Sequence, residues 1–72
     1  MAIRIKPTPM KYRDLIKRLE EDGWFLERVT GSHMQFRHAT KSGTVTVPAG
    51  GKLTRAVPPG TLNSVLKQAG LK

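Results

Sequence analysis

The chain has 72 residues, no cysteine and a formal net charge of +8, from 13 Lys and Arg against five Asp and Glu. This length predicts one domain with a thin core, and the lack of cysteine excludes disulfides and thiolate metal sites and gives no sign of an oxidising compartment. The charge favours a polyanionic partner, with nucleic acid ahead of an acidic protein.

Apolar runs in the sequence are only a few residues long, far short of the roughly 20 residues that span a bilayer. The first six residues also lack the apolar region of a signal peptide. We therefore expect a soluble cytoplasmic protein with no membrane partner.

Residues 1–9 contain two prolines and precede any helical pattern. They predict a flexible N-terminal arm, and residues 10–72 then form the single domain.

The first helix is predicted from Met10 to Asp22, because apolar residues recur there at helical spacing. Thr8 suits the N-cap and Pro9 the first helical position. Gly23 suits the position after the last turn.

A first strand is predicted over residues 24–30, which are rich in aromatic and β-branched residues. The sequence does not decide which face of this strand is buried, because Trp24 and Leu26 compete with Phe25 and Val29 for the core.

Two further strands follow, with tight turns before and between them, which completes an antiparallel meander. Successive strand side chains point to opposite faces, so the period of two separates an apolar face from a polar one. The apolar face, predicted to be core, carries Met34, Phe36, Val45 and Val47. The polar face carries His33, Gln35, Arg37, Thr44 and Thr46.

Pro48 ends the third strand, and residues 49–57 predict an exposed basic loop. The second helix starts at the Pro58-Pro59-Gly60-Thr61 segment and ends at Gly70. Because a lone three-stranded sheet needs a partner layer, both helices must cover its apolar face. The predicted fold class is α+β, in the order α-β-β-β-α, with a three-stranded antiparallel sheet and both helices packed on one face.

Five short motifs along residues 11–72 resemble, in order and spacing, those of the HicA family, the toxins of HicA-HicB toxin-antitoxin systems. They are Asp22-Gly23-Trp24, Gly31-Ser32-His33, Thr44-Val45-Thr46-Val47-Pro48, Pro59-Gly60-Thr61-Leu62 and Val65-Leu66-Lys67-Gln68-Ala69-Gly70-Leu71. The resemblance implies a small ribonuclease with a fold similar to the double-stranded RNA-binding domain. It also implies that His33 is the catalytic histidine, that messenger RNA is cut without the ribosome, and that a HicB-type antitoxin covers the site.

His33 has the chemistry that this role needs. Imidazole titrates near neutral pH, so it can take the proton of an RNA 2′-hydroxyl or give one to the leaving 5′-oxygen. Taken without the resemblance, a surface histidine that only hydrogen-bonds is the simpler interpretation, because one histidine is no constellation. His38 falls on the apolar side of its strand, which predicts a structural role. Since the two histidines lie on opposite faces, we expect neither an acid-base pair nor a metal site, and no cofactor.

Other polar residues are candidate RNA contacts. Arg37 follows His33 on the same face at about 13 Å along an extended strand, so it suits a neighbouring phosphate, with Gln35 between them. Ser32 can present its hydroxyl to a phosphate oxygen. Backbone phosphate contacts are predicted for Lys11, Lys41, Lys52 and Arg55. Each of these residues also fits a simpler role, in a turn or as a solvated charge.

With the role that the resemblance implies, we expect the toxin of a type II toxin-antitoxin system, a metal-independent mRNA endoribonuclease that leaves a 2′,3′-cyclic phosphate. The alternative is a non-catalytic module that binds double-stranded RNA by its shape. In a third interpretation, the basic surface serves mainly to bind an acidic protein.

Overall fold

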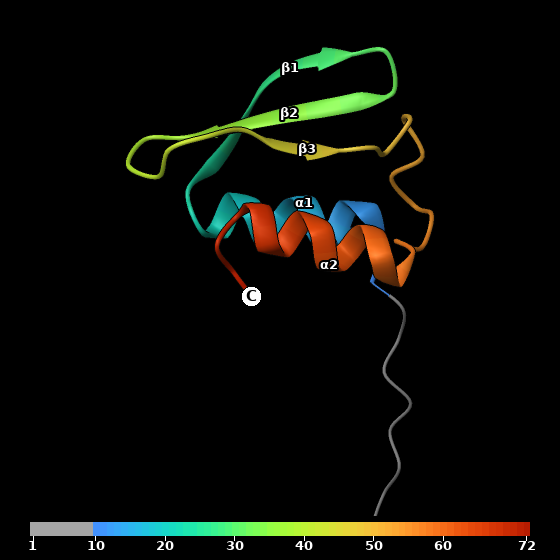
Figure 1. Ribbon diagram of the computed structural model, residues 1–72. Coiled ribbons are helices and arrows are strands. Elements are labelled where there is room, and N and C mark those ends of the chain that lie inside the picture. The colour runs from blue at the N-terminus through green and yellow to red at the C-terminus, as the bar shows by residue number, and fades with distance from the viewer. Residues whose placement is uncertain (1–9) are drawn as a thin grey trace, which may run out of the picture.

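The computed structural model describes residues 10–72, so the predicted N-terminal arm and the predicted cap at Thr8 and Pro9 lie outside the described residues. The elements are α1 (Tyr12–Glu21), β1 (Trp24–Thr30), β2 (His33–His38), β3 (Val45–Val47) and α2 (Pro59–Gln68). The strands form one antiparallel sheet in the order β1-β2-β3, and both helices lie on the same face of it (Figure 1). The predicted α+β class and the α-β-β-β-α order are confirmed.

The start of α1 is capped by a distant part of the chain. The helix begins at Tyr12, later than predicted, with Lys11 as its N-cap. The backbone N–H groups of Tyr12 and Arg13 each donate to a carbonyl oxygen at 2.9 Å, those of Arg55 and Leu53. The first N–H groups of a helix have no acceptors inside the helix. Here the loop between β3 and α2 supplies carbonyl acceptors for two of these N–H groups.

A β-bulge at Glu27 sets the faces of β1. The register between β1 and β2 shifts there, so that Leu26 lies opposite Phe36 before the bulge and Val29 lies opposite Met34 after it. Residues that pair across an antiparallel sheet point to the same face. Leu26 and Val29 therefore both point to the helix side, although their spacing in the sequence puts them on opposite faces.

The helices cover only the beginning of β1. Trp24 is 2% exposed, whereas Leu26 and Val29 are 43% and 56% exposed on the helix side of the strand. Phe25 points to the other face and is 51% exposed. The question that the sequence left open therefore has a simple answer, since Trp24 is the one residue of β1 that enters the core.

The core fills the space between the sheet and the two helices, with α1 against β1 and α2 against β3. Its buried residues are Tyr12, Leu15, Leu19, Trp24, Phe36, Val45, Val47, Ala49, Val57, Val65 and Ala69. The predicted apolar face of the second and third strands is confirmed, with Met34 half-buried at its rim. Within residues 10–72 no helix is long and apolar enough to cross a membrane.

Candidate active site

His33 is the first residue of β2 and follows a tight turn. Gly31 in this turn has a φ of +58°, in the left-handed region that glycine adopts without strain. The turn is tied to the loop after β3, because the Gly50 N–H donates to the Ser32 carbonyl oxygen at 2.9 Å. These contacts place an exposed histidine at one end of the sheet, beside the start of that loop.

A cleft of about 350 Å³ lies between β3 and α2, and His33 is part of its lining. The other lining residues are Thr46, Pro48, Gly60, Thr61, Ser64, Val65 and Gln68. Among these described residues His33 carries the only titratable side chain, and the remaining polar groups are hydroxyls and one amide. Between residues 10 and 72 no three His, Asp or Glu side chains gather where a metal ion could be held.

Gln68 joins the two walls of this cleft. Its Oε1 accepts a hydrogen bond at 3.2 Å from the backbone N–H of Thr46 in β3, the last strand in the order β1-β2-β3. Its Nε2 donates at 3.2 Å to Ser64 Oγ, one helical turn earlier in α2. The sequence analysis missed this pair. The signal that could have revealed it is the spacing of four residues, at which polar side chains on a helix meet.

The turn before β2, the loop between β3 and α2 and the start of α1 lie at the same end of the molecule (Figure 1), and four of the predicted RNA contacts belong to these segments. Ser32 precedes His33, and Lys52 and Arg55 belong to the loop that is bonded to Ser32 through Gly50 and to the start of α1. Lys11 forms a backbone bridge with this same loop. Lys52, Arg55 and Ser32 are exposed, and Lys11 is half-buried.

Two further predicted contacts lie on the sheet face that the helices leave open. Gln35 accepts a hydrogen bond at 3.3 Å from the Arg28 guanidinium, a neighbour that the sequence analysis did not consider. Arg37 is exposed and pairs with Phe25 across the strands, farther from the cleft. The open face thus combines two guanidinium groups with an exposed aromatic ring.

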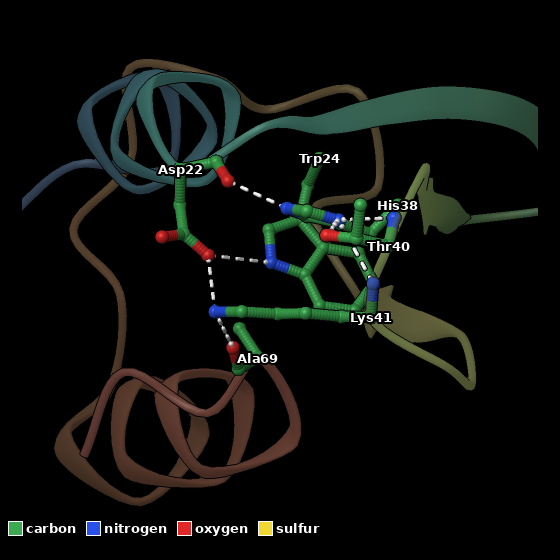
Figure 2. A network of polar contacts seen from close by, with 6 residues as sticks. All are labelled: Asp22, Trp24, His38, Thr40, Lys41 and Ala69. Carbon is green, nitrogen blue, oxygen red and sulfur yellow. Dashed lines mark hydrogen bonds and ion pairs between the residues drawn. The ribbon is translucent and has the colours of Figure 1, made fainter.

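His38, at the other end of β2, is held in a structural network (Figure 2). Its Nε2 donates to the Asp22 carbonyl oxygen at 2.6 Å, because a carbonyl can only accept. Its Nδ1 accepts from the backbone N–H groups of Thr40 and Lys41 at 3.0 and 3.1 Å. The ring also meets Trp24 edge to face, with centroids 5.1 Å apart. These contacts give His38 the structural role that its place on the strand predicted.

Lys41 belongs to the same network, in which its ammonium group makes two hydrogen bonds. It donates to the Asp22 carboxylate at 2.6 Å and to the Ala69 carbonyl oxygen at 3.1 Å (Figure 2). The Trp24 indole N–H donates to the same carboxylate at 3.1 Å. The hydrogen bond from Lys41 lowers the pKa of the Asp22 carboxyl below its ordinary value of 3.8. The structure therefore places Lys41 in a structural ion pair, away from the other predicted RNA contacts.

Comparison with known proteins identifies the family. No curated protein matches the chain. The family described as "HicA toxin of bacterial toxin-antitoxin" matches residues 12–71, a range that contains all five elements and every residue that lines the cleft. The element order also agrees with the fold that the sequence resemblance implied. The chain therefore belongs to the HicA toxin family, and its role is that of the toxin that pairs with an antitoxin.

Proposed function

We propose that this toxin is an mRNA endoribonuclease in which His33 is the general acid or base. The observation that carries the proposal is the position of His33, an exposed imidazole in a cleft whose other lining residues, within 10–72, have neutral side chains. The chain's net charge of +8 supports a polyanionic substrate.

The chemistry needs only the substrate and a proton carrier. His33 takes the proton from a ribose 2′-hydroxyl, whose oxygen attacks the adjacent phosphorus. The bond from phosphorus to the 5′-oxygen breaks, and that oxygen takes a proton from water, to which His33 returns the proton that it removed; the products are a 2′,3′-cyclic phosphate and a 5′-hydroxyl end. The proposed mechanism is metal-independent, because the nucleophile is part of the RNA and His33 is the proton carrier. A positioned acid or base of this kind contributes about 10²- to 10⁴-fold in rate.

Cationic side chains hold the RNA on either side of the cleft in this proposal. Lys11, Lys52 and Arg55 bind backbone phosphates at the His33 end, and Arg37 binds one farther along the open sheet face. Such contacts supply affinity without reading sequence. Lys41 is omitted, since its ammonium group is bonded to Asp22 and Ala69.

The proposal extends to the cellular setting. The toxin acts in the cytoplasm on messenger RNA without the ribosome, and an antitoxin of the HicB type covers the cleft. Family membership and the exposure of His33 support this arrangement. In a purified complex, the antitoxin should make His33 inaccessible to solvent.

The test compares the wild-type protein with His33→Ala on an end-labelled RNA in EDTA, with analysis of both fragment ends. We expect cleavage by the wild type alone, with a cyclic phosphate at the new 3′ side. Because His33 is exposed, the thermal unfolding of the variant should match that of the wild type. Full activity of His33→Ala would contradict the proposal. Intact RNA that is nevertheless shifted in a gel would favour a non-catalytic RNA-binding module instead.

A further inference from the structure

We propose that Ser64 donates a hydrogen bond to a phosphate oxygen of RNA in the cleft, and that Gln68 is the positioning residue that turns its hydroxyl there. This inference rests on the proposed ribonuclease function, which supplies the phosphate. It adds a second residue to the site beside His33, and gives the wall formed by α2 a role in binding.

The first step concerns the direction of the hydrogen bonds around Gln68. The Thr46 N–H can only donate, so the amide oxygen of Gln68 must face β3. The amide nitrogen then faces Ser64 and donates to its Oγ. Exchanging the two ends of the amide would set a donor against a donor at Thr46, so this orientation is fixed by a backbone group that cannot change.

The second step concerns what remains to the Ser64 hydroxyl. A serine hydroxyl can accept bonds and donate one. Its Oγ is used as an acceptor, and within residues 10–72 it makes no other hydrogen bond. A serine inside a helix often donates to the carbonyl of the preceding turn, but Ser64 makes no such bond. The O–H of Ser64 is therefore available to a group that accepts.

The third step concerns location. Ser64 and Gln68 line the same cleft as His33, with Thr61 one turn before Ser64 on the same side of α2. The cleft holds no carboxylate among its described lining residues, so an anion there meets hydroxyl and amide groups and no like charge. A phosphate oxygen is a strong acceptor, and a hydrogen bond to a charged acceptor is about twice as strong as a neutral one.

Gln68 also fixes the distance between the two walls. The Thr46 N–H of β3 donates to the amide oxygen of Gln68, so this side chain links β3 to α2. His33 is attached to β3 through the β2 ladder, so the same contact sets where Ser64 stands relative to the imidazole. Loss of Gln68 should therefore disturb the position of the bound phosphate while the imidazole itself stays in place.

The experiment compares Ser64→Ala with Ser64→Thr, which retains the hydroxyl. We expect Ser64→Ala to lower kcat/KM by about 10- to 100-fold, the range for losing one hydrogen bond to a charged group. Ser64→Thr should restore most of the activity. Equal losses in both variants would show that packing and not the hydroxyl is responsible, and would overturn the inference.

Gln68→Glu tests the positioning role. A carboxylate can accept from both the Thr46 N–H and the Ser64 O–H, which draws the hydroxyl away from the cleft and adds a negative charge beside it. We expect kcat/KM to fall at least as far as in Ser64→Ala, while the midpoint of thermal unfolding stays close to the wild-type value. Activity equal to that of the wild type would contradict the role of Gln68.

A binding measurement separates the failure of this inference from that of the proposed function. The probe is an RNA of the same sequence with 2′-O-methyl groups, which cannot be cleaved by 2′-hydroxyl attack. Its Kd should be several-fold larger for Ser64→Ala than for Ser64→Thr. Binding of the probe should also change the NMR chemical shifts of the His33 ring less in Ser64→Ala than in Ser64→Thr. Equal Kd values overturn the inference even if RNA is cut. If natural RNA is not cut but the Kd values differ as expected, the ribonuclease proposal fails and the phosphate contact stands.

Discussion

Gly23 shows how much a single side-chain atom matters where α1 meets β1. Its φ is +102°, and a methyl group there would lie 2.7 Å from His38 Nε2. Gly23→Ala should therefore suffer both backbone strain and a clash with the ring of the structural network. Gly43 has a similar φ of +87° but open space around it, so Gly43→Ala isolates the strain.

We expect both variants to be less stable than the wild type in urea unfolding. The strain alone should cost about 1–3 kcal/mol, and the clash should make Gly23→Ala worse by about 1 kcal/mol or more. His38 cannot move aside without losing its bonds to Asp22 and to the backbone at Thr40 and Lys41. The same loss of stability in both variants would mean that this ring is free to shift.

Among elements, the contact between Asp22 and Lys41 joins the end of α1, the loop between β2 and β3, and the end of α2 at Ala69 (Figure 2). The Asp22 pKa is lowered in the folded protein, so the unfolded chain binds a proton more readily as the solution becomes acidic. The stabilisation from this carboxylate is complete above the ordinary value of 3.8 and is lost as the pH falls through the lowered pKa.

Asp22→Asn tests this pH dependence, since it keeps the shape of the side chain and removes its charge. We expect the variant to be less stable than the wild type at about pH 7, and the difference in unfolding free energy to shrink as the pH falls to about 3 and below. Urea unfolding of both proteins across this range measures it. A difference that does not change with pH would assign the effect to hydrogen bonding alone.

The elements also show which parts of the fold can be predicted from local sequence. The alternation of apolar and polar residues in β2 and β3 was sufficient to predict their buried face. Phe36, Val45 and Val47 follow a strict period of two and are all buried. The alternation in β1 fails at Glu27, where a bulge changes the period, and a bulge depends on the partner strand. The start of α1 was misplaced because its cap is a distant loop.

For the candidate site, His33 could be predicted from its motif and its strand face, but the α2 wall of the cleft could not be predicted from the sequence. Ser64 and Gln68 look like an ordinary polar helix face until β3 is placed beside them. The ion pair of Lys41 with Asp22 could not be predicted, because the two residues are 19 positions apart in the chain. Pairings over such separations depend on the tertiary structure.

At the scale of the whole molecule, the cationic side chains behind the net charge of +8 have different surroundings. Lys52 lies exposed near the His33 end, whereas Lys41 is bonded at the opposite end of the sheet. In the proposed complex Lys52 contacts a phosphate and Lys41 does not. Each phosphate contact to a single strand changes the slope of log K against log salt by about 0.7.

We expect Lys52→Ala to reduce the salt slope of RNA binding by about 0.7 and Lys41→Ala to leave it unchanged. Fluorescence anisotropy with the His33→Ala background avoids cleavage of the RNA during the titration. Lys41→Ala also removes the ion pair with Asp22, so both variants are compared well below their unfolding temperatures. A slope that falls equally in the two variants would mean that RNA also binds at the Lys41 end.

One wall of the cleft is formed by β3 and the other by α2. Because the ribosome makes β3 before α2, the cleft can form only late in synthesis. A ribosome that has reached Pro58 has already produced His33, but it has not yet produced Ser64 or Gln68. Val45 and Val47 also lack the helix that covers them at that moment. The unfinished chain therefore carries its histidine without a complete cleft, and the cleft forms only once α2 has emerged and folded against the sheet.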